Sequence, residues 1–541
     1  MMNMKKLSVY LFIATSTIVT HAQTASEGLQ ALDFEQFEKA RGIFTTLTLQ
    51  EPTNGAHFYY LGQAQWKLYK ATEAAAAYQA GIVAEPTNPM NYAGLGEIAL
   101  ADEKTDVAKS QFNKALSFNK TKDGRYKDIN ALRFVADAMV SEDTKLLDEA
   151  ITYIELALEM DKKNYDVLIT AGDVYLEKNE GGKAATMYEN AISLQKNNPK
   201  AYTRVSNIWL RVRNAEATKT ELDRALAIDS NYAPALKNLA EYYSQSKQYA
   251  KAKETYQRYL QNSEPSSANK ARFARILFRN KEYAEALFVI NDLQKLDTSD
   301  IYLFRLAGYS YYEVGNETKD TTKFQPGVTA LTYFMKTIDS TKILSNDYEY
   351  LGKLYSRMKG KDSLAIVNIE KALAMDPNKI ELLKEAGMIY NKLKRFDQSV
   401  MYFEQYITSA PKVLLVDYQL LGLASFYGKQ YPKSDSAFSK IIELKPDYAD
   451  GYYWKGAIAA GIDTEFKTTT AKDYWEKYLT LTEATPEKYK KNLVNTYNYL
   501  AQYWIKNDNN LKNLKAKEYF NKALVLDPEN KIAKDYLKQL K

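Results

Sequence analysis

Few side chains of this 541-residue chain are of the types that enzymes use for catalysis. The chain has two histidines, His21 and His57, and no cysteine, so histidine-based acid–base chemistry, thiol nucleophiles and thiolate metal sites have almost no residues to use. Adjacent carboxylates, as at Asp102-Glu103 and Glu142-Asp143, fall in predicted turns, where solvation accounts for them better than glycosidase chemistry does. No glycine-rich phosphate loop follows a predicted strand. We therefore expect no enzyme activity, no cofactor and no metal site.

The side chains best suited to binding are basic and aromatic. Guanidinium and ammonium groups hold carboxylates through charge-assisted hydrogen bonds, and aromatic rings serve as anchors for peptides or sugars. Basic and amide side chains recur in three neighbouring segments, at Lys200, Arg204, Asn207, Arg211, Lys237, Asn238, Arg272, Arg275 and Arg279. The chain also has 44 tyrosines, many of them regularly spaced. Whether these groups can act together depends on the elements that carry them.

Those elements come from a pattern that recurs fourteen times between Gly28 and Pro528, usually 34 residues apart. Its anchor is a small residue followed four positions later by a large apolar one, and in ungapped units another small residue stands twelve positions before the anchor. The anchors are Ala40/Phe44, Ala74/Tyr78, Ala108/Phe112, Ala150/Ile154, Ala184/Tyr188, Thr218/Leu222, Ala252/Tyr256, Ala286/Ile290, Ala330/Phe334, Ala365/Ile369, Ser399/Phe403, Ser434/Phe438, Ala471/Trp475 and Ala516/Phe520. Apolar residues in each unit follow two short helical periods separated by a turn. The pattern predicts helical hairpins that bury their apolar faces by stacking.

This pattern resembles the tetratricopeptide repeat. The second unit carries the family's signature of small, aromatic and proline residues as Gly62, Ala74, Tyr78, Gly81 and Pro86, and the resemblance runs from about Gln23 to the C-terminus. It implies an all-α, right-handed superhelical solenoid of antiparallel helix pairs, with a C-terminal capping helix in residues 530–541. We expect one continuous solenoid, with units 1–3 in residues 23–120, units 4–8 in 121–300 and units 9–14 in 301–541.

In tetratricopeptide arrays the first helix of each pair lines a concave groove, and this register assigns candidate binding residues. The residues that this register places toward the groove are Lys200, Asn207, Arg211, Lys237, Arg275 and Arg279. Adjacent positions are held by Arg204, Asn238 and Arg272. The inward aromatic residues are Tyr59, Trp66, Tyr302, Tyr309, Tyr312, Phe426 and Tyr427. Most other tyrosines, such as Tyr78, occupy packing positions of the repeat.

A subset of the inward residues resembles a carboxylate clamp. Some members of the family hold a peptide's terminal carboxylate with five lysine, asparagine and arginine side chains from three successive units. Asn207, Asn238 and Arg272 match three of these positions, whereas Thr203 and Ala268 replace the two lysines. The resemblance implies a basic groove suited to an acidic or carboxylate-bearing segment. A solvated basic face without a ligand is the alternative.

The first 22 residues have the character of a secretory signal. Lys5 and Lys6 precede an apolar run from Leu7 to Val19, and small residues lead to Gln23. The run is too short for a stable transmembrane anchor, and the chain has no cysteine that could carry a lipid. We expect an exported protein in the periplasm or at the outer membrane. After removal of residues 1–22, 71 basic and 67 acidic residues leave a net charge of +4, which is no nucleic-acid footprint.

Longer spacings between anchors indicate insertions at 141–147, 315–327, 462–470 and 506–514. Such insertions map to loops on one side of a repeat array, where they either bind or are merely tolerated. Taken together, these observations predict a non-enzymatic scaffold or adaptor of the cell envelope that binds proteins or peptides in its groove. The alternatives are a glycan or cell-wall binder that uses the groove aromatics and, less favoured, a carboxylate-based hydrolase.

Overall fold

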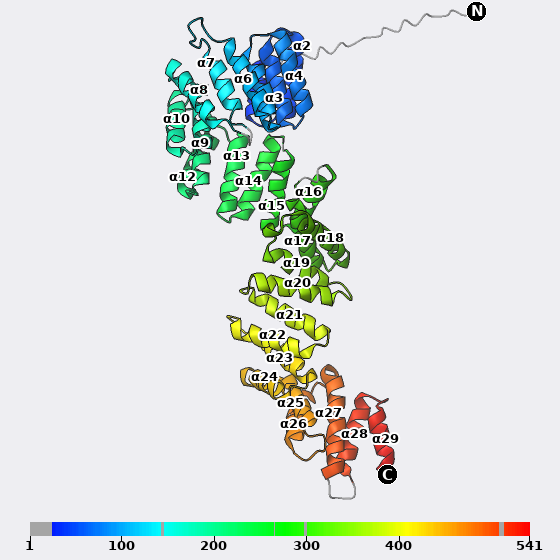
Figure 1. The fold of residues 1–541 in the computed structure, drawn as a ribbon. Helices are drawn as coiled ribbons and strands as arrows, with labels where there is room; N and C mark the ends of the chain where they lie inside the picture. Colours follow the sequence, from blue (N-terminus) through cyan, green and yellow to red (C-terminus); the bar gives the residue numbers. More distant parts are fainter. Residues whose placement is uncertain (1–23, 142–144, 265, 297–299, 508–512, 541) are drawn as a thin grey trace, which may run out of the picture. The chain divides into compact units, whose positions relative to one another are not determined.

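The computed structural model describes residues 24–141, 145–264, 266–296, 300–507 and 513–540, which form successive helix pairs (Figure 1). The predicted signal segment, residues 1–22, and Glu142-Asp143 lie outside these residues. Contacts divide the chain into two compact units, Met1–Leu293 and Gln294–Lys541. The described residues contain no strand apart from an isolated bridge between Lys120 and Tyr126, so the all-α prediction is confirmed. In the same part of the chain, no helix combines the length and apolar character needed to cross a membrane.

The first unit is built from eight helix pairs. Their bounds are α1 Ala25–Asp33, α2 Phe37–Gln50, α3 Gly55–Lys67, α4 Ala71–Ala84, α5 Pro89–Ala101, α6 Thr105–Ser117, α7 Ile129–Ala138, α8 Leu147–Met160, α9 Tyr165–Glu177, α10 Gly181–Leu194, α11 Pro199–Arg211, α12 Ala215–Ile228, α13 Ala233–Gln245, α14 Tyr249–Asn262, α15 Ser267–Arg279 and α16 Tyr283–Leu296. Asparagine side chains cap the starts of several first helices, as Asn54 does for α3 and Asn88 for α5.

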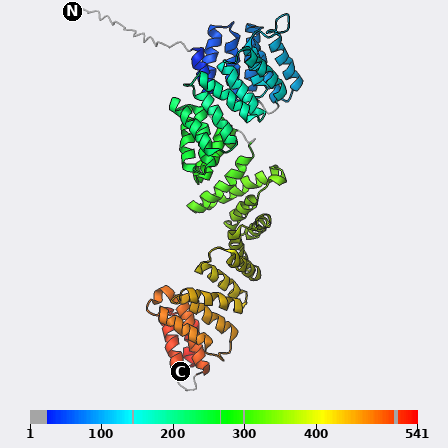
Figure 2. The same ribbon diagram turned by 90° about the vertical axis from the view of Figure 1, so that its left-hand side faces the viewer.

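The second unit has six further pairs and a terminal helix (Figure 2). The bounds are α17 Tyr302–Thr318, α18 Phe324–Thr337, α19 Ser345–Ser356, α20 Asp362–Met375, α21 Ile380–Lys392, α22 Phe396–Ser409, α23 Leu415–Tyr427, α24 Tyr431–Leu444, α25 Ala449–Ile462, α26 Thr470–Thr482, α27 Pro486–Asn507, α28 Leu514–Leu526 and α29 Lys531–Gln539, with short 3-10 turns at Thr321–Lys323 and Ser340–Lys342. The predicted capping helix is α29, in which Ala533 is buried and Tyr536 stacks on Phe520.

The recurring small residues allow each pair to pack closely. A Cβ atom added at Gly62 of α3 would lie 2.3 Å from the Tyr78 ring of α4, and one added at Gly94 of α5 would lie 2.5 Å from the same ring. Real Cβ atoms do not come that close, so only glycine fits at both positions. The large anchor residue therefore packs against its own first helix and against the first helix of the next pair.

The structure buries every predicted anchor except one. Ala330 in α18 is only half-buried, whereas its neighbour Leu331 is fully buried. A Cβ atom at Gly308 of α17 would lie 2.8 Å from the Cβ of Leu331, so Leu331 takes the position that Phe334 was predicted to hold against that glycine. The shift follows an insertion in this unit that lengthens α17 to 17 residues.

Two of the four insertions lie where the anchor spacing indicated. The insertion at 315–327 contains the end of α17 and a 3-10 turn, and that at 462–470 forms the connection between α25 and α26. The prediction at 141–147 was wrong for most of the extra residues, because they lie before α7. The first residue of α7 comes 24 residues after the first residue of α6, whereas the corresponding distance from α4 to α5 is 18 residues. The prediction at 506–514 was also wrong for most of the extra residues, because they lengthen α27 to 22 residues; residues 508–512 of the predicted segment lie outside the described residues.

The tight glycine contacts lead to a stability prediction in the second unit. A Cβ atom at Gly387 of α21 would lie 2.6 Å from the Phe403 ring. We expect Gly387→Leu to lower the free energy of unfolding by roughly 1–3 kcal/mol, because the added side chain overfills this contact, and Gly352→Leu to behave similarly. The measurement is urea unfolding followed by circular dichroism.

The matched control is Gly42→Leu, since Gly42 lies in α2 with no atom within 4 Å of an added Cβ. It should be neutral or slightly stabilising, because leucine favours helix more than glycine does. Lys359→Leu, at an exposed turn, should also be neutral. Equal losses at Gly387, Gly42 and Lys359 would contradict the assigned packing.

Candidate functional site

The first unit contains an open cavity of about 1940 Å³. Its walls come mainly from the first helices of the pairs, namely α1, α3, α7, α9, α11 and α13, together with the link between α1 and α2. The cavity is larger than the 300–1,000 Å³ or so that small-molecule sites usually occupy. Its dimensions therefore suit a polypeptide segment better than a metabolite.

The link between α1 and α2 closes the cavity by contacting helices that lie more than 200 residues later in the sequence. The carboxylate of Glu35 accepts a hydrogen bond of 2.6 Å from the Tyr259 hydroxyl and forms an ion pair with Lys237. The backbone N–H of Glu264 donates to the Glu35 carbonyl at 3.0 Å. In return, the Glu264 carboxylate accepts from the backbone N–H groups of Glu38 and Lys39 at the start of α2.

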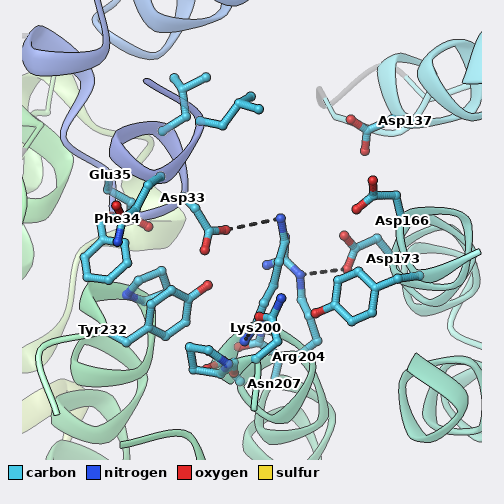
Figure 3. A pocket seen from close by; sticks show the side chains of 18 of the residues that line it. Asp33, Phe34, Glu35, Asp137, Asp166, Asp173, Lys200, Arg204, Asn207 and Tyr232 are labelled. Atoms are coloured by element: carbon cyan, nitrogen blue, oxygen red, sulfur yellow. Dashed lines mark hydrogen bonds and ion pairs between the residues drawn. The ribbon is translucent and has the colours of Figure 1, made fainter. Parts of the chain in front are cut away.

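Apolar and ionic contacts support this closure on both sides of Glu35. The ring of Phe34 meets the buried ring of Tyr232 edge to face, with the centroids 5.3 Å apart. Asp33 forms an ion pair of 3.2 Å with Lys200 of α11 (Figure 3). The Gln36 side chain donates to the Asn262 carbonyl at 2.9 Å. The first helix pair is thus fixed to the sixth and seventh pairs.

Seven of the predicted groove residues line this cavity: Tyr59, Lys200, Arg204, Asn207, Arg211, Lys237 and Asn238. The remaining predicted residues do not line it. Arg272, Arg275 and Arg279 lie on α15, and the Arg279 guanidinium donates to Ser244 at 3.0 Å. Trp66 is on α3, while Tyr302, Tyr309 and Tyr312 belong to α17 of the second unit, where Tyr309 and Tyr312 are buried. A role of any of these residues in binding stays a prediction.

The four predicted basic residues of the cavity have acidic partners, whereas Arg133, which also lines it, forms no ion pair with a described residue. Besides the Lys200 and Lys237 pairs, Arg204 lies 3.1 Å from Asp173, and Arg211 lies 2.7 Å from Glu177. Asn207 and Asn238 bond to each other at 2.6 Å. Because these charges are already compensated inside the protein, the cavity does not present the uniformly basic surface that the resemblance implied.

Several acidic side chains of the cavity were not singled out from the sequence. Figure 3 shows Asp137, Asp166 and Asp173 on the side formed by α7 and α9, and Asp33 and Glu35 on the α1–α2 link. Asp166 and Asp173 stand in the same helical register as the predicted basic residues, so counting acids in that register would have found them. Asp33 also stands in this register, five residues after Gly28 as Arg211 is after Ser206, whereas Glu35 does not, and its partners lie far away in the sequence.

The chain is similar in sequence to known tetratricopeptide repeat proteins. Residues 26–89 match one tetratricopeptide repeat family description, and residues 233–264 and 383–413 match another. The crystal structure of the C-terminal part of a TPR repeat-containing protein from Cytophaga hutchinsonii is 32% identical in sequence, and the match covers 49% of this chain and 98% of that one, with a TM-score of 0.40. The helical-hairpin array thus belongs to the tetratricopeptide repeat family, as the sequence pattern predicted.

Two further relatives have lower identities. A TPR repeat-containing protein from Methanocaldococcus jannaschii is 26% identical over 260 residues, which is 45% of this chain and 43% of that protein, so less than half of the archaeal relative is matched. A chain of the APC/C hetero-tetramer Cut9-Hcn1 is 14% identical, with 73% of this chain and 95% of that chain covered and a TM-score of 0.34.

The closing contact of Glu35 predicts a long-range loss of stability. We expect Glu35→Ala to lower the free energy of unfolding of the first unit by roughly 1.5–3 kcal/mol, the range for hydrogen bonds to a charged group. Hydrogen exchange should speed up in α1, α13 and α14, because the contact joins these helices. Urea unfolding and exchange read by mass spectrometry measure the two effects.

Glu103→Ala is the matched control. Glu103 has the same left-handed backbone (φ 59°, against 56° at Glu35) in the corresponding turn between α5 and α6, and its side chain is exposed. Both variants place alanine in this left-handed conformation, so the conformational cost of the substitution is the same in both and cancels when their free energies of unfolding are compared. A Glu35→Ala variant no less stable than Glu103→Ala would show that the contact does not hold the unit closed.

Proposed function

We propose that this chain is a non-enzymatic scaffold or adaptor that binds segments of other proteins, with the cavity of the first unit as a principal binding site. The observation that carries the proposal is the cavity itself, which is lined by the inner helices of the repeats and exceeds the size of a small-molecule site. Membership of the tetratricopeptide repeat family supports the same function by analogy of fold. The alternative of a glycan site is weakened because the rings of Tyr309 and Tyr312 are buried, although Tyr302 and Tyr427 are exposed.

The proposed location is the cell envelope, in the periplasm or in an outer-membrane-associated complex. The support is the signal-like character of residues 1–22. Cell fractionation of the full-length chain, with N-terminal sequencing of the mature protein, tests it. A mature chain starting at Gln23 supports export, and an intact leader in the cytoplasm overturns it.

Filling the cavity should block binding. Leu210 of α11 lines the cavity, and a tryptophan there would occupy the space of a bound segment. We expect Leu210→Trp to reduce recovery of co-purifying proteins at least tenfold when the chain is used for affinity capture from its native cells. Mass spectrometry with isotope-labelled reference peptides measures the recovery.

The control is Leu49→Trp, because Leu49 of α2 is 79% exposed and does not line the cavity. It makes the same change of side chain on the outer surface and should leave recovery unchanged. Equal recovery with Leu210→Trp and Leu49→Trp would exclude the cavity as the binding site, provided that both variants unfold at the temperature of the parent.

A second candidate is an acidic segment bound at α15. Arg272 is exposed and forms no ion pair with any described residue, unlike the paired basic residues of the cavity. Such a guanidinium can hold a carboxylate in two parallel hydrogen bonds.

Charge reversal tests this candidate. We expect the double variant Arg272→Glu/Arg275→Glu to bind a glutamate-rich peptide at least tenfold more weakly, which corresponds to about 1.4 kcal/mol. Fluorescence anisotropy measures the affinity. Lys251→Glu/Lys295→Glu, two exposed positions on second helices, makes the same change of net charge and should have a smaller effect. Equal effects of the two double variants would indicate attraction by net charge alone.

A further inference from the structure

Asp137 lines the cavity, and the protein compensates its carboxylate only in part. It lies in the last turn of α7, where the carbonyl end of a helix disfavours anions. Among the described residues, its carboxylate has no ion pair and no hydrogen bond. Burial raises the pKa of this carboxyl, and so does the charge of Glu97, whereas Arg133, Lys67 and Arg204 lower it.

The basic groups near Asp137 are engaged elsewhere. The guanidinium of Arg133, one helical turn before Asp137, stacks on the ring of Phe134 with its Cζ atom 3.9 Å from the centroid. Arg204 pairs with Asp173, and the Lys67 ammonium lies 3.7 Å from the carboxylate of Glu97. Among the described residues, no ion pair joins Arg133 or Arg204 to Asp137, although both lower the pKa of its carboxyl.

A second polar group at the same wall also lacks a partner. Tyr59 of α3 lines the cavity and is only 6% exposed, yet its hydroxyl forms no hydrogen bond with any described residue. Burial raises the pKa of this phenol well above its usual value, and the nearby carboxylates of Glu97 and Asp137 raise it further. Because this hydroxyl faces the cavity and has no partner among the described residues, it can form a hydrogen bond with a ligand there.

The surroundings of Asp137 favour a cation as that ligand. Phe134, Tyr60 and Tyr165 line the same part of the cavity, and aromatic faces attract ammonium and guanidinium groups. Asp166 adds a second carboxylate without an ion pair to a described residue, although the N-terminus of α9 partly stabilises its charge.

We infer that the wall formed by α3, α7 and α9 binds a lysine or arginine side chain of the protein segment held in the cavity, with Asp137 as its counter-charge and the Tyr59 hydroxyl as a hydrogen-bond partner. This inference rests on the proposed function, because it names the chemistry of the segment that the cavity takes. The bound cation pairs with a half-buried carboxylate that has no ion pair among the described residues, so the site favours a basic residue.

A random nine-residue peptide library displayed on phage and selected on the full-length chain tests the inference. We expect lysine or arginine to be enriched at least threefold at one peptide position. The selected peptides, made synthetically, should bind Asp137→Asn at least tenfold more weakly and Tyr59→Phe about threefold more weakly, as measured by fluorescence anisotropy. Exchanging the enriched basic residue for norleucine should remove the difference between the parent chain and Asp137→Asn.

Asp102→Asn is the matched control, because Asp102 is an exposed carboxylate at the end of α5 and does not line the cavity. It should leave peptide affinity unchanged. Thermal unfolding checks that Asp137→Asn remains folded, which we expect because the substitution removes a charge that the protein compensates only in part.

The cavity-filling variant Leu210→Trp separates failure of the inference from failure of the proposed function. Peptides that lose binding to Leu210→Trp depend on the cavity. If such peptides carry no basic residue, are enriched in acidic residues, or bind Asp137→Asn as well as the parent, the inference is overturned and the cavity remains a peptide site. If no selected peptide depends on the cavity, both the proposed function and the inference are wrong.

Discussion

The contact between a glycine of one helix and a large ring of its partner governs the rest of this structure. Tyr78 lies between Gly62 of its own pair and Gly94 of the next pair, at distances that leave no room for a Cβ atom. The ring therefore sets both the spacing within a pair and the spacing between pairs. Because this contact repeats along the chain, the first helices of the pairs stay on one side, and in the first unit they line an open cavity.

Closure of that cavity depends on a different kind of interaction. A solenoid normally contacts only its nearest neighbours, but here the short link between α1 and α2 reaches α11, α13 and α14. The same residues that close the cavity also neutralise part of its wall, since Asp33 pairs with Lys200 and Glu35 with Lys237. The shape and the charge of the site are therefore coupled. If the α1–α2 link moved away from α11 and α13, Lys200 and Lys237 would lose their acidic partners inside the cavity.

The repeat and its register could be predicted from the sequence because they depend on contacts between residues close in the chain. The closure could not, because no local pattern marks Glu35 as the partner of residues more than 200 positions away. Spacing between anchors counts inserted residues but does not say whether they extend a helix or a loop, which is why the segments before α7 and within α27 were misplaced. The exposure of Ala330 has the same origin, since a longer α17 changes which residue meets Gly308.

The charges of the cavity show why residue type alone is a weak guide to ligand chemistry. Lys200, Arg204 and Arg211 suggested an anionic partner, but each has an internal carboxylate within 3.2 Å and is compensated before any ligand arrives. A charge that is already paired contributes little to attraction and loses its pairing when a ligand competes for it. A group that the protein leaves without an ion pair gains more from a ligand, and the Asp137 carboxylate at the carbonyl end of α7 is such a group in this cavity.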